Sequence, residues 1–522
     1  MTFWRGFRQP ARWAALLSGA IPVLAFPAAN QEYLAWIGLL PGLALMRCAR
    51  TGREAAVRGW WYGTGYLLAA MYWLAPNLGP GLLLLAIALG ALWSCVGLAT
   101  WALLRPPVSA ARAAAAFVVV PSCWLVTEWI RSWQGIGGPW DVLGASQWQH
   151  PVVLALAAAG GVWLISFVLV AANTGLLIVL TGGRLAVRLA GLAAALAAVA
   201  AGPVAWAVTP PAPAGQPLTV ALVQPGLTSN AAVRLYRSEQ LTVAAARRAD
   251  LFVWGESSVG YNLATRPAIL ASVEHLARTS GAEILVDQDA ANAAGATSKQ
   301  ATLISGTGIR GRYVKTRLVP FGEYIPLRPV LGWLTAISRA APTNVVPGNG
   351  AHVLHATLPD GRPLTIGVLI CFESAFPDMS RVDTDQGARV IIYQTSDTTF
   401  QQSWAPGQHA SLSALRAAET GRPVVQAALT GDSAAFDSRG RLLAWAGTSY
   451  SGTLLADLGL PPASYRTLFD QIGDVVPWTA VGVAALAALA GLARAGSARR
   501  RSRNQGAHGE AGLLAGSRLP GS

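Results

Sequence analysis

Long apolar stretches constrain the fold of this chain more than any other sequence feature. A helix needs about 20 apolar residues to cross a bilayer hydrocarbon core about 30 Å thick. Seven such stretches lie before residue 210, and an eighth stands alone near the end of the chain. They cover approximately residues 13–28, 31–46, 60–75, 82–104, 113–130, 152–180, 185–208 and 475–495. The pattern predicts a polytopic α-helical membrane bundle of about eight spans.

The composition supports a membrane protein, because only 12% of the 522 residues are charged and 53% are hydrophobic. About a quarter of the residues are charged in a typical soluble domain. The first apolar stretch follows Arg5, Arg8 and Arg12 and ends in small residues, so a cleaved signal peptide is an alternative to a first span. A second apolar stretch follows almost at once, which favours a retained helix.

The segment between the seventh and eighth stretches has a different character. It has short apolar runs, many turns and most of the acidic residues, and its length suits one α/β domain. A Pro-rich linker at 209–217 marks its start. The predicted division is a seven-span bundle at 1–210, an inserted domain at 211–474, an eighth transmembrane helix at 475–496 and a basic, disordered cytoplasmic tail at 497–522.

The distribution of cations predicts the orientation, since Lys and Arg concentrate in cytoplasmic connections. Alternate connections are basic, beginning with the N-terminus. Their cations are Arg5, Arg8 and Arg12, then Arg47, Arg50, Arg53 and Arg58, then Arg105 and Arg112, then Arg184 and Arg188, then Arg499, Arg500, Arg501 and Arg503. The opposite connections carry few charges. We therefore expect both termini in the cytoplasm and the 211–474 domain outside the cell membrane.

The net charge of +14 follows the same topology. Residues 211–474 hold 21 cations and 20 acids, a net of +1, whereas the remainder holds 18 and 5, a net of +13. A nucleic-acid-binding domain would offer excess positive charge to phosphates. The inserted domain has almost none, so nucleic acid is not an expected partner.

Several runs in the inserted domain resemble buried strands that end in polar residues. Strand ends are where sites collect in α/β sheets. Glu256 closes the run LFVWGE, Cys371 follows TIGVLI, and Lys315 lies in GRYVKTRLVPFGEYIP. The alternatives are a helix cap or a salt-bridge partner for Glu256 and a buried structural role for Cys371, the only cysteine of the domain.

Lys315 is informative because the 39 cations comprise 37 Arg and only two Lys. A position that keeps Lys against this bias indicates a need for a compact ammonium, which a guanidinium cannot replace. A surface position is the alternative for Lys315, and a surface position in a loop is the expectation for Lys299. A Glu that accepts the thiol proton, a Lys that stabilises an oxyanion and a Cys that carries an acyl group form an acyl-transfer apparatus.

No metal or organic cofactor is expected. The four cysteines, Cys48, Cys95, Cys123 and Cys371, have no disulfide or zinc spacing. His352 and His355 have a ligand-like gap but no carboxylate or cysteine cluster beside them. No Gly-rich phosphate loop of the Walker type is present.

The motifs resemble those of a known superfamily. They are WGES around Glu256, Y-x-K-x-x-L-V-P-F-G-E-Y-x-P from Tyr313 to Pro326, and C-F-E from Cys371 to Glu373. These are similar to the nitrilase superfamily. With the added bundle, GGPWDVLGASQW and the later P-G-Q-H and R-A-A-E-T-G-R-P runs, the chain resembles bacterial apolipoprotein N-acyltransferases over nearly its whole length.

This resemblance implies an αββα sandwich and a ping-pong reaction. Glu256 would deprotonate Cys371, which would take an acyl chain from a membrane phospholipid as a thioester. The α-amino group of a diacylglyceryl-cysteine at an apolipoprotein N-terminus would then accept the chain as an amide.

The resemblance also implies supporting residues. Glu323 and Glu373 match carboxylates beside the triad that would hold and tune Lys315, with a structural ion pair as the alternative for each. Phe372 stands where an aromatic residue follows the nucleophile. Trp140 and Tyr324 are expected to bind substrate. The loop from 131 to 150 that contains Trp140 is either an ordinary aromatic belt or an element that contacts lipid.

Some loops depart from the pattern of the family. Ser396-Asp397-Thr398-Thr399-Phe400 replaces Asn-Asp-Ala-Trp-Phe, and Leu429-Thr430-Gly431-Asp432 replaces an Asn-rich turn. No Trp follows Gln224 within a dozen residues. These departures bear on the choice of acyl chain and acceptor, and they keep three alternatives open. The alternatives are a membrane-bound nitrilase-type amidase, a non-catalytic scaffold that binds lipoproteins, which the substituted loops motivate, and a transporter, which the small number of ionisable residues in the spans disfavours.

Overall fold

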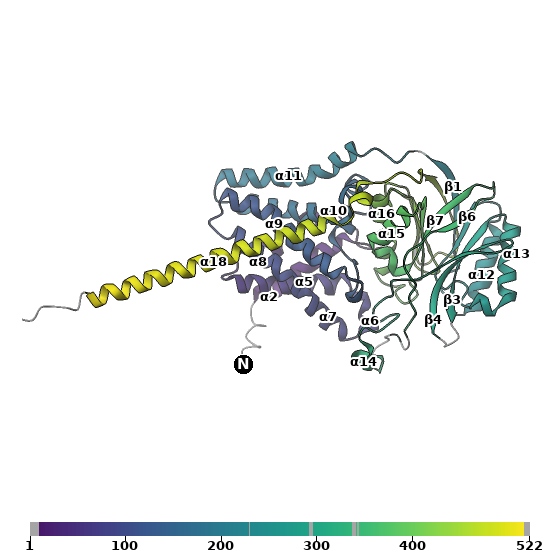
Figure 1. Cartoon of the computed structure of the whole chain (residues 1–522), viewed down its shortest axis with the longest axis horizontal. Helices are drawn as coiled ribbons and strands as arrows, with labels where there is room; N and C mark the ends of the chain where they lie inside the picture. Colours follow the sequence, from purple (N-terminus) through teal and green to yellow (C-terminus); the bar gives the residue numbers. More distant parts are fainter. Residues whose placement is uncertain are drawn as a thin grey trace, which may run out of the picture.

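The computed structural model describes residues 10–213, 215–228, 230–291, 296–336, 341 and 344–515. A helical bundle and a domain built on β-sheets lie side by side, and one long helix extends from their junction along the bundle and beyond it (Figure 1). We call residues 10–208 the bundle and residues 216–474 the sheet domain. The predicted boundary near residue 210 falls in the connection between them.

The bundle contains several apolar helices. Their bounds are α2 (Pro10–Ala20), η1 (Ile21–Ala25), α3 (Leu34–Ile37), α4 (Leu40–Arg47), α5 (Gly52–Ala70), η2 (Tyr72–Leu74), α6 (Ala75–Leu78), α7 (Gly81–Gly90), η3 (Ala91–Trp93), α8 (Ser94–Leu104), α9 (Ala110–Arg131), α10 (Pro151–Thr181) and α11 (Leu185–Val208). Within the described residues, five helical stretches are long and apolar enough to cross a membrane: Gly81–Leu104, Ala110–Arg131, Pro151–Thr181, Leu185–Val208 and Val475–Arg494. The first two predicted spans form shorter helices, Pro10–Ala25 and Leu34–Arg47. The count of about eight spans stays a prediction.

The first helix packs closely inside the bundle. A Cβ atom added to Gly65 of α5 would lie 1.9 Å from the carbonyl oxygen of Leu16 in α2, and one added to Gly19 would lie 2.1 Å from that of Tyr62. Such distances leave no room for a side chain at either glycine. A helix held this closely is an integral part of the bundle, which favours retention over cleavage as a signal peptide.

We expect Gly65→Ala to lower the unfolding temperature of the protein in detergent. Alanine favours helix over glycine by about 1 kcal/mol, so a helix without a close neighbour would gain stability. At Gly65 the added methyl group would force α2 and α5 apart, and overpacking costs about 1–3 kcal/mol. Gly482→Ala in the last helix is the matched control, because nothing lies within 4 Å of its added Cβ. Equal unfolding temperatures for the two variants would contradict the close contact.

Helix α10 contains a kink that its apolar sequence does not reveal. Gly160 and Gly161 have non-helical backbone angles, with φ −153° and φ 70° respectively. The second value is in a region that favours glycine. The kink frees the backbone N–H of Val162, which donates instead to Oε1 of Glu419 in the sheet domain at 2.8 Å. The predicted span at 152–180 is therefore bent where it meets the sheet domain.

The described part of the sheet domain contains two six-stranded sheets, in the orders β12-β1-β2-β3-β4-β5 and β11-β10-β9-β8-β7-β6. The strands are β1 (Gln216–Gln224), β2 (Leu251–Trp254), β3 (Glu283–Ala291), β4 (Thr297–Ser305), β5 (Gly308–Val314), β6 (Leu354–Thr357), β7 (Pro363–Ile370), β8 (Val390–Thr395), β9 (Val424–Ala428), β10 (Ser433–Phe436), β11 (Leu442–Ala446) and β12 (Gly452–Leu460). Strands β1 to β3 pair in parallel, as do β7 to β9, and the outer pairs are antiparallel. Both sheets are therefore mixed.

Alternation along the strands gives each sheet two apolar faces. In β2, Leu251 and Val253 join the core shared with the second sheet, whereas Phe252 and Trp254 join a separate core under α12 (Ala231–Ala244) and α13 (Pro267–Ser280). Successive side chains of a strand point to opposite faces, so one short apolar run supplies both cores. The second sheet contacts α15 (Pro377–Asp385) and α16 (Ala405–Thr420).

Helix α16 lies between the second sheet and α10 of the bundle (Figure 1). All of its residues except Gly407 are buried, including the charged residues Arg416 and Glu419, which pair at 3.1 Å. Thr467, before α17 (Leu468–Ile472), donates to the carbonyl oxygen of Glu419. The packing of α16 on α10 therefore joins the sheet domain to the bundle.

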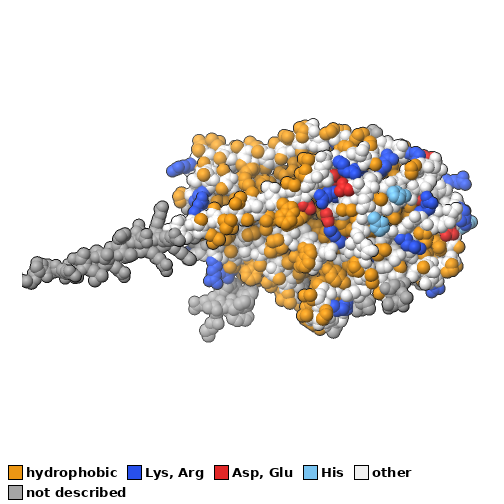
Figure 2. All heavy atoms as spheres, viewed as in Figure 1, with side chains coloured by type: hydrophobic (Ala, Val, Ile, Leu, Met, Phe, Trp, Pro, Cys, Tyr) orange, Lys and Arg blue, Asp and Glu red, His pale blue; other side chains and the backbone are white. Residues whose placement is uncertain are grey.

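The last helix, α18, runs from Val475 to Ala515. It is longer than the predicted span at 475–496, because the helix continues through the basic segment that was expected to be a disordered tail. The backbone of that segment is helical up to Ala515, and residues 516–522 lie outside the described residues. Figure 2 shows hydrophobic side chains over much of the bundle and charged side chains gathered over the sheet domain on this face.

Candidate active site

Lys315 is held between two carboxylates in the interior of the sheet domain. It directly follows β5 and is fully buried. Its Nζ donates to Oε1 of Glu256 at 3.3 Å and to Oε1 of Glu323 at 2.7 Å. Burial alone would lower the pKa of Lys315, but Glu256 and Glu323 outweigh it and hold that pKa well above its usual value. Lys315 is therefore a fixed cation rather than a base.

Cys371 lies at a sharp turn between β7 and the short helix η8 (Cys371–Ala375). Its φ of 54° is in the left-handed region, which costs a non-glycine residue about 1–3 kcal/mol and is common at active sites. Burial and the charge of Glu256 raise the pKa of the thiol well above its usual value, and Lys315 opposes this effect. The structure thus brings Glu256, Lys315 and Cys371 together, in surroundings that disfavour the thiolate form of Cys371.

Glu323 and Glu373 have different roles. Glu323 contacts Lys315 directly, as expected. Glu373 instead accepts from the Tyr313 hydroxyl at 2.8 Å and from the backbone N–H groups of Thr316 at 2.7 Å, Arg317 at 2.9 Å and Ile370 at 2.7 Å. It therefore joins the segment after β5 to the turn at Cys371. The expectation that it holds Lys315 is replaced by a role in fixing the backbone on both sides of the site.

We expect Glu373→Gln to destabilise the protein by about 1–3 kcal/mol, the cost of leaving a buried donor unsatisfied. The amide nitrogen of Gln would face an N–H group that now donates to a carboxylate oxygen. The unfolding temperature and the rate of Cys371 alkylation measure the effect. Glu239→Gln is the matched control, since the Glu239 side chain accepts from the Ser272 hydroxyl at an exposed site. An unchanged unfolding temperature in Glu373→Gln would show that this carboxylate is dispensable.

Two of the three expected aromatic residues, Phe372 and Trp140, lie near the turn at Cys371. Phe372 packs edge-on against Phe376, with ring centroids 4.9 Å apart. Trp140 is buried, its ring centroid is 5.3 Å from that of His409, and its Nε1 donates to Gln408 at 3.2 Å. Tyr324 is partly buried in the loop after Glu323. Their binding of substrate stays a prediction.

The loop from 131 to 150 is mostly an internal connection between the bundle and the sheet domain. Trp140 and Trp148 are buried, and the ring of Trp148 lies 5.2 Å from that of Trp445 in β11. Only Trp133 of the three tryptophans in this loop is well exposed. The loop therefore does not form an ordinary aromatic belt, because two of its three tryptophans, Trp140 and Trp148, pack against the sheet domain.

Lys299 is not the surface residue that its loop-like sequence suggested. It lies on β4, and its Nζ donates to the Asp289 carboxylate and to the Ser257 hydroxyl. Ser257 follows Glu256 directly and has a φ of 57°. The charge of Glu256 is among the causes that raise the pKa of Lys299. Both lysines of the chain therefore lie beside the proposed base.

Sequence reasoning missed one residue at the site, His409 of α16. Its Nε2 lies 3.1 Å from the carbonyl oxygen of Cys371, and its Nδ1 lies 3.0 Å from Oδ1 of Asp397. The P-G-Q-H run contributed only to the resemblance, because nothing in the sequence indicates that α16 packs against the turn at Cys371. Trp140, from the 131–150 loop, and His409 together form one side of the site.

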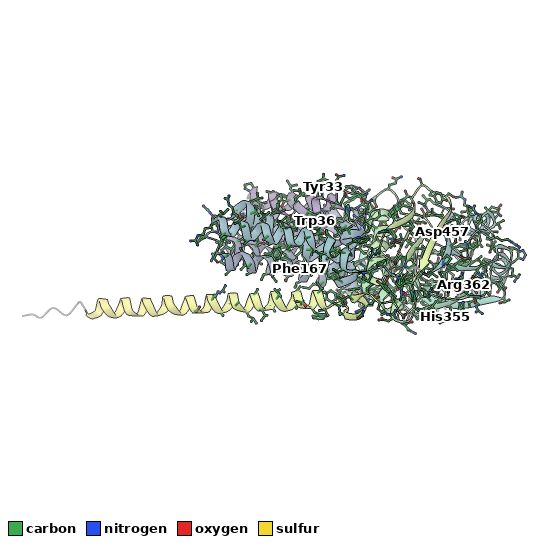
Figure 3. The ribbon with its side chains drawn as sticks, turned by 90° about the horizontal axis from the view of Figure 1, so that it is seen from above. Tyr33, Trp36, Phe167, His355, Arg362 and Asp457 are labelled. Atoms are coloured by element: carbon green, nitrogen blue, oxygen red, sulfur yellow. The ribbon has the colours of Figure 1, made fainter. Side chains whose placement is uncertain are left out.

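The histidines considered as metal ligands have other partners. The His352 Nε2 lies 3.0 Å from the carbonyl oxygen of Arg312, and His355 Nδ1 lies 3.4 Å from the Thr365 hydroxyl. Figure 3 places His355 in the sheet domain, apart from the bundle residues Trp36 and Phe167. Among the residues that the structure describes, no group of three His, Cys, Asp or Glu side chains could hold a metal ion.

Comparisons with known proteins agree with this architecture. The model of the "Apolipoprotein N-acyltransferase N-terminal domain" family matches residues 18–175, and the "Carbon-nitrogen hydrolase" model matches residues 219–463. The Apolipoprotein N-acyltransferase of Geobacter metallireducens is 30% identical over 513 residues, which cover 91% of this chain and 94% of that protein. This chain belongs to the apolipoprotein N-acyltransferase family.

A second family member, from Allorhizobium ampelinum, is 31% identical and covers 86% of this chain and 89% of its own length. Among solved structures, the carbon-nitrogen hydrolase of Helicobacter pylori G27 is 14% identical with a TM-score of 0.36, over 47% of this chain and 89% of that one. The match to the carbon-nitrogen hydrolase model confirms the nitrilase-like fold expected for the sheet domain of this chain.

Proposed function

We propose that this protein transfers an acyl chain from a membrane phospholipid, through a thioester on Cys371, to the α-amino group of a diacylglyceryl-cysteine at an apolipoprotein N-terminus. Family membership supports an acyltransferase that acts on apolipoproteins in a membrane. The observation that carries the catalytic assignment is the buried Glu256–Lys315–Glu323 cluster beside the strained turn at Cys371.

In the first half-reaction, Glu256 takes the thiol proton, and the Cys371 sulfur attacks the ester carbonyl carbon of the phospholipid. Negative charge develops on the carbonyl oxygen, and the Lys315 ammonium stabilises it. The ester C–O bond then breaks, the leaving oxygen takes the proton from Glu256, and a lysophospholipid departs. A thioester remains on Cys371.

In the second half-reaction, the α-amino group of the acceptor attacks the thioester carbonyl. Glu256 accepts a proton from the amine, Lys315 again stabilises the oxyanion, and the C–S bond breaks. The proton returns to the sulfur, so the thiol is regenerated and an amide is released. An amide is more stable than a thioester, which drives this step forward.

The site is joined to the bundle by aromatic residues from both parts. Trp73, after α5, donates through Nε1 to Oε1 of Gln408 at 3.0 Å, and its ring lies 4.9 Å from that of Phe400. Tyr72 packs edge-on against Trp404 at 5.8 Å. These contacts support entry of lipid-borne substrates from the bundle side, with Trp140 and Tyr324 as candidate substrate contacts.

The same proposal includes the arrangement in the membrane. Eight spans would leave both termini in the cytoplasm and the sheet domain, a four-layer αββα sandwich, outside the cytoplasmic membrane. Two features of Figure 2 support this orientation. Hydrophobic side chains lie over the surface of the bundle, and cationic side chains lie at the end of the bundle away from the sheet domain. Lipoproteins and phospholipids of the outer leaflet would then both reach Cys371.

A transfer assay tests the proposed function. The purified protein in phospholipid vesicles should convert a diacylglyceryl-cysteine peptide to its N-acyl form, with one lysophospholipid formed for each amide. Release of free fatty acid without amide would favour the nitrilase-type amidase alternative. Binding of the peptide without any turnover would favour the non-catalytic scaffold.

A further inference from the structure

A buried aspartate–histidine pair lies directly behind Cys371 and has no role in the reaction described above. His409 and Asp397 are both almost fully buried, at 1% and 4% exposure. His409 Nδ1 lies 3.0 Å from Asp397 Oδ1, and His409 Nε2 lies 3.1 Å from the Cys371 carbonyl oxygen and 3.0 Å from the Ser374 hydroxyl. The pair thus connects the segment after β8 to the turn that carries the nucleophile.

The acceptors around the ring define its protonation. A carboxylate oxygen and a carbonyl oxygen only accept hydrogen bonds, so both ring nitrogens must carry a proton to satisfy them. The Ser374 hydroxyl can accept from Nε2 as well. A neutral ring would turn a nitrogen lone pair toward one of the two acceptors. The geometry therefore favours an imidazolium, and the Asp397 charge correspondingly holds the pKa of His409 above its usual value although burial opposes it.

The charges around the thiol show why an imidazolium matters. Glu256, Glu323 and Asp397 all raise the pKa of Cys371 and so disfavour its thiolate, whereas Lys315 is the cation that lowers it. The other oxygen of Asp397, Oδ2, has no hydrogen-bond partner among the described residues. Burial and Asp397 together also raise the pKa of the nearby Asp432 to about 6. His409 is thus the ion-pair partner of a carboxylate that would otherwise act on Cys371 unopposed.

We propose that His409, paired with Asp397, is a positioning residue that fixes the backbone carbonyl of Cys371 and neutralises the Asp397 carboxylate, so that the Cys371 thiolate can form. The proposal rests on the proposed role of Cys371 as the nucleophile. Asp397, Glu256 and Cys371 are the titratable groups that face the ring, from the segments after β8 and β2 and from η8. Trp140 covers the ring from the bundle side and carries no charge.

The test uses alkylation of Cys371 by iodoacetamide, which needs neither lipid nor acceptor. The purified full chain is alkylated across a pH series, and mass spectrometry follows the Cys371 peptide, with the exposed Cys48 as internal standard. His409→Gln leaves Asp397 unpaired, so we expect the midpoint of Cys371 alkylation to rise by about one pH unit or more. Adding Asp397→Asn removes the unpaired charge and should return the midpoint most of the way to the wild-type value.

This rescue separates an electrostatic role from a merely structural one, because a second disruptive change would not restore a damaged fold. An unshifted midpoint in His409→Gln, or a double variant that reacts no faster than the single one, would overturn the proposal. If the wild type and variants behave as expected here but no acyl transfer occurs, the proposed function fails while the role of the pair stands.

A second measurement covers the case in which His409→Gln does not fold. Imidazole 15N shifts of the wild-type protein at pH 7.5 should show both ring nitrogens of His409 protonated, with the His409 signals assigned through their change in Asp397→Asn. A His409 ring that is neutral at this pH would overturn the proposal without any substitution at His409.

Discussion

Replacing Lys315 by Met is expected to reduce acyl transfer by about a thousandfold and to destabilise the protein by about 3–5 kcal/mol. The rate falls because the oxyanion loses its cation. The stability falls because the buried Glu256 and the partly buried Glu323 would have no cation between them, and Lys315 itself is fully buried. Initial rates of N-acyl peptide formation and urea unfolding in detergent measure the two effects.

Two further variants test whether the effect is specific to an ammonium group at position 315. Lys315→Arg keeps the charge but places a larger planar group in a fully buried site, so we expect it to lose most of the activity as well. Arg310→Met, in the strand β5 that precedes Lys315, is the matched control, because the Arg310 side chain is 48% exposed and its ion pair with Glu283 should contribute at most about 1 kcal/mol. Full activity in Lys315→Arg would contradict the need for an ammonium at this position.

Glu256→Gln should change the rate of acyl transfer and the acidity of the Cys371 thiol in opposite directions. We expect acyl transfer to fall by about 100-fold to 10,000-fold, since the general base is lost. The Cys371 thiol should nevertheless become more acidic, because the Glu256 charge is one cause of its raised pKa. Lys315 keeps Glu323 as a partner at 2.7 Å, so the protein should remain folded.

Transfer assays and the pH dependence of Cys371 alkylation measure the two properties in the same preparation. Slower transfer with a lower alkylation midpoint would identify Glu256 as a base that the reaction needs. A variant that transfers acyl chains as fast as the wild type would remove Glu256 from the mechanism. Asp289→Asn is a useful comparison, because Asp289 belongs to the neighbouring Lys299 cluster and does not contact Lys315.

Residues at strand ends were predictable from the sequence. Glu256 and Cys371 end short apolar runs that form β2 and β7, and Lys315 follows β5, so their types and places in the chain indicate the site. Glu373 shows the limit of such reasoning. Besides the Tyr313 hydroxyl, its partners are backbone N–H groups from two segments, and backbone groups have no signature in a sequence.

Contacts between distant segments explain the features of the structure that the sequence did not predict. Lys299 appeared to lie in a loop, but the strand pairing of β3 and β4 places it against Asp289 and beside Glu256. His409 reaches Cys371 only because α16 is clamped between the second sheet and α10. The kink at Gly160 and Gly161 likewise depends on Glu419, a residue more than 250 positions away, which accepts from the N–H group freed there.

Direct detection of an acyl group on Cys371 is the most decisive measurement. The purified protein is incubated with phospholipid vesicles in the absence of any acceptor, quenched in acid and analysed by intact-mass and peptide mass spectrometry. The account predicts one acyl chain per protein on Cys371, labile to hydroxylamine, absent in Cys371→Ala and released as amide when a diacylglyceryl-cysteine peptide is added. A folded wild-type protein that forms N-acyl peptide without ever carrying this thioester would contradict the account.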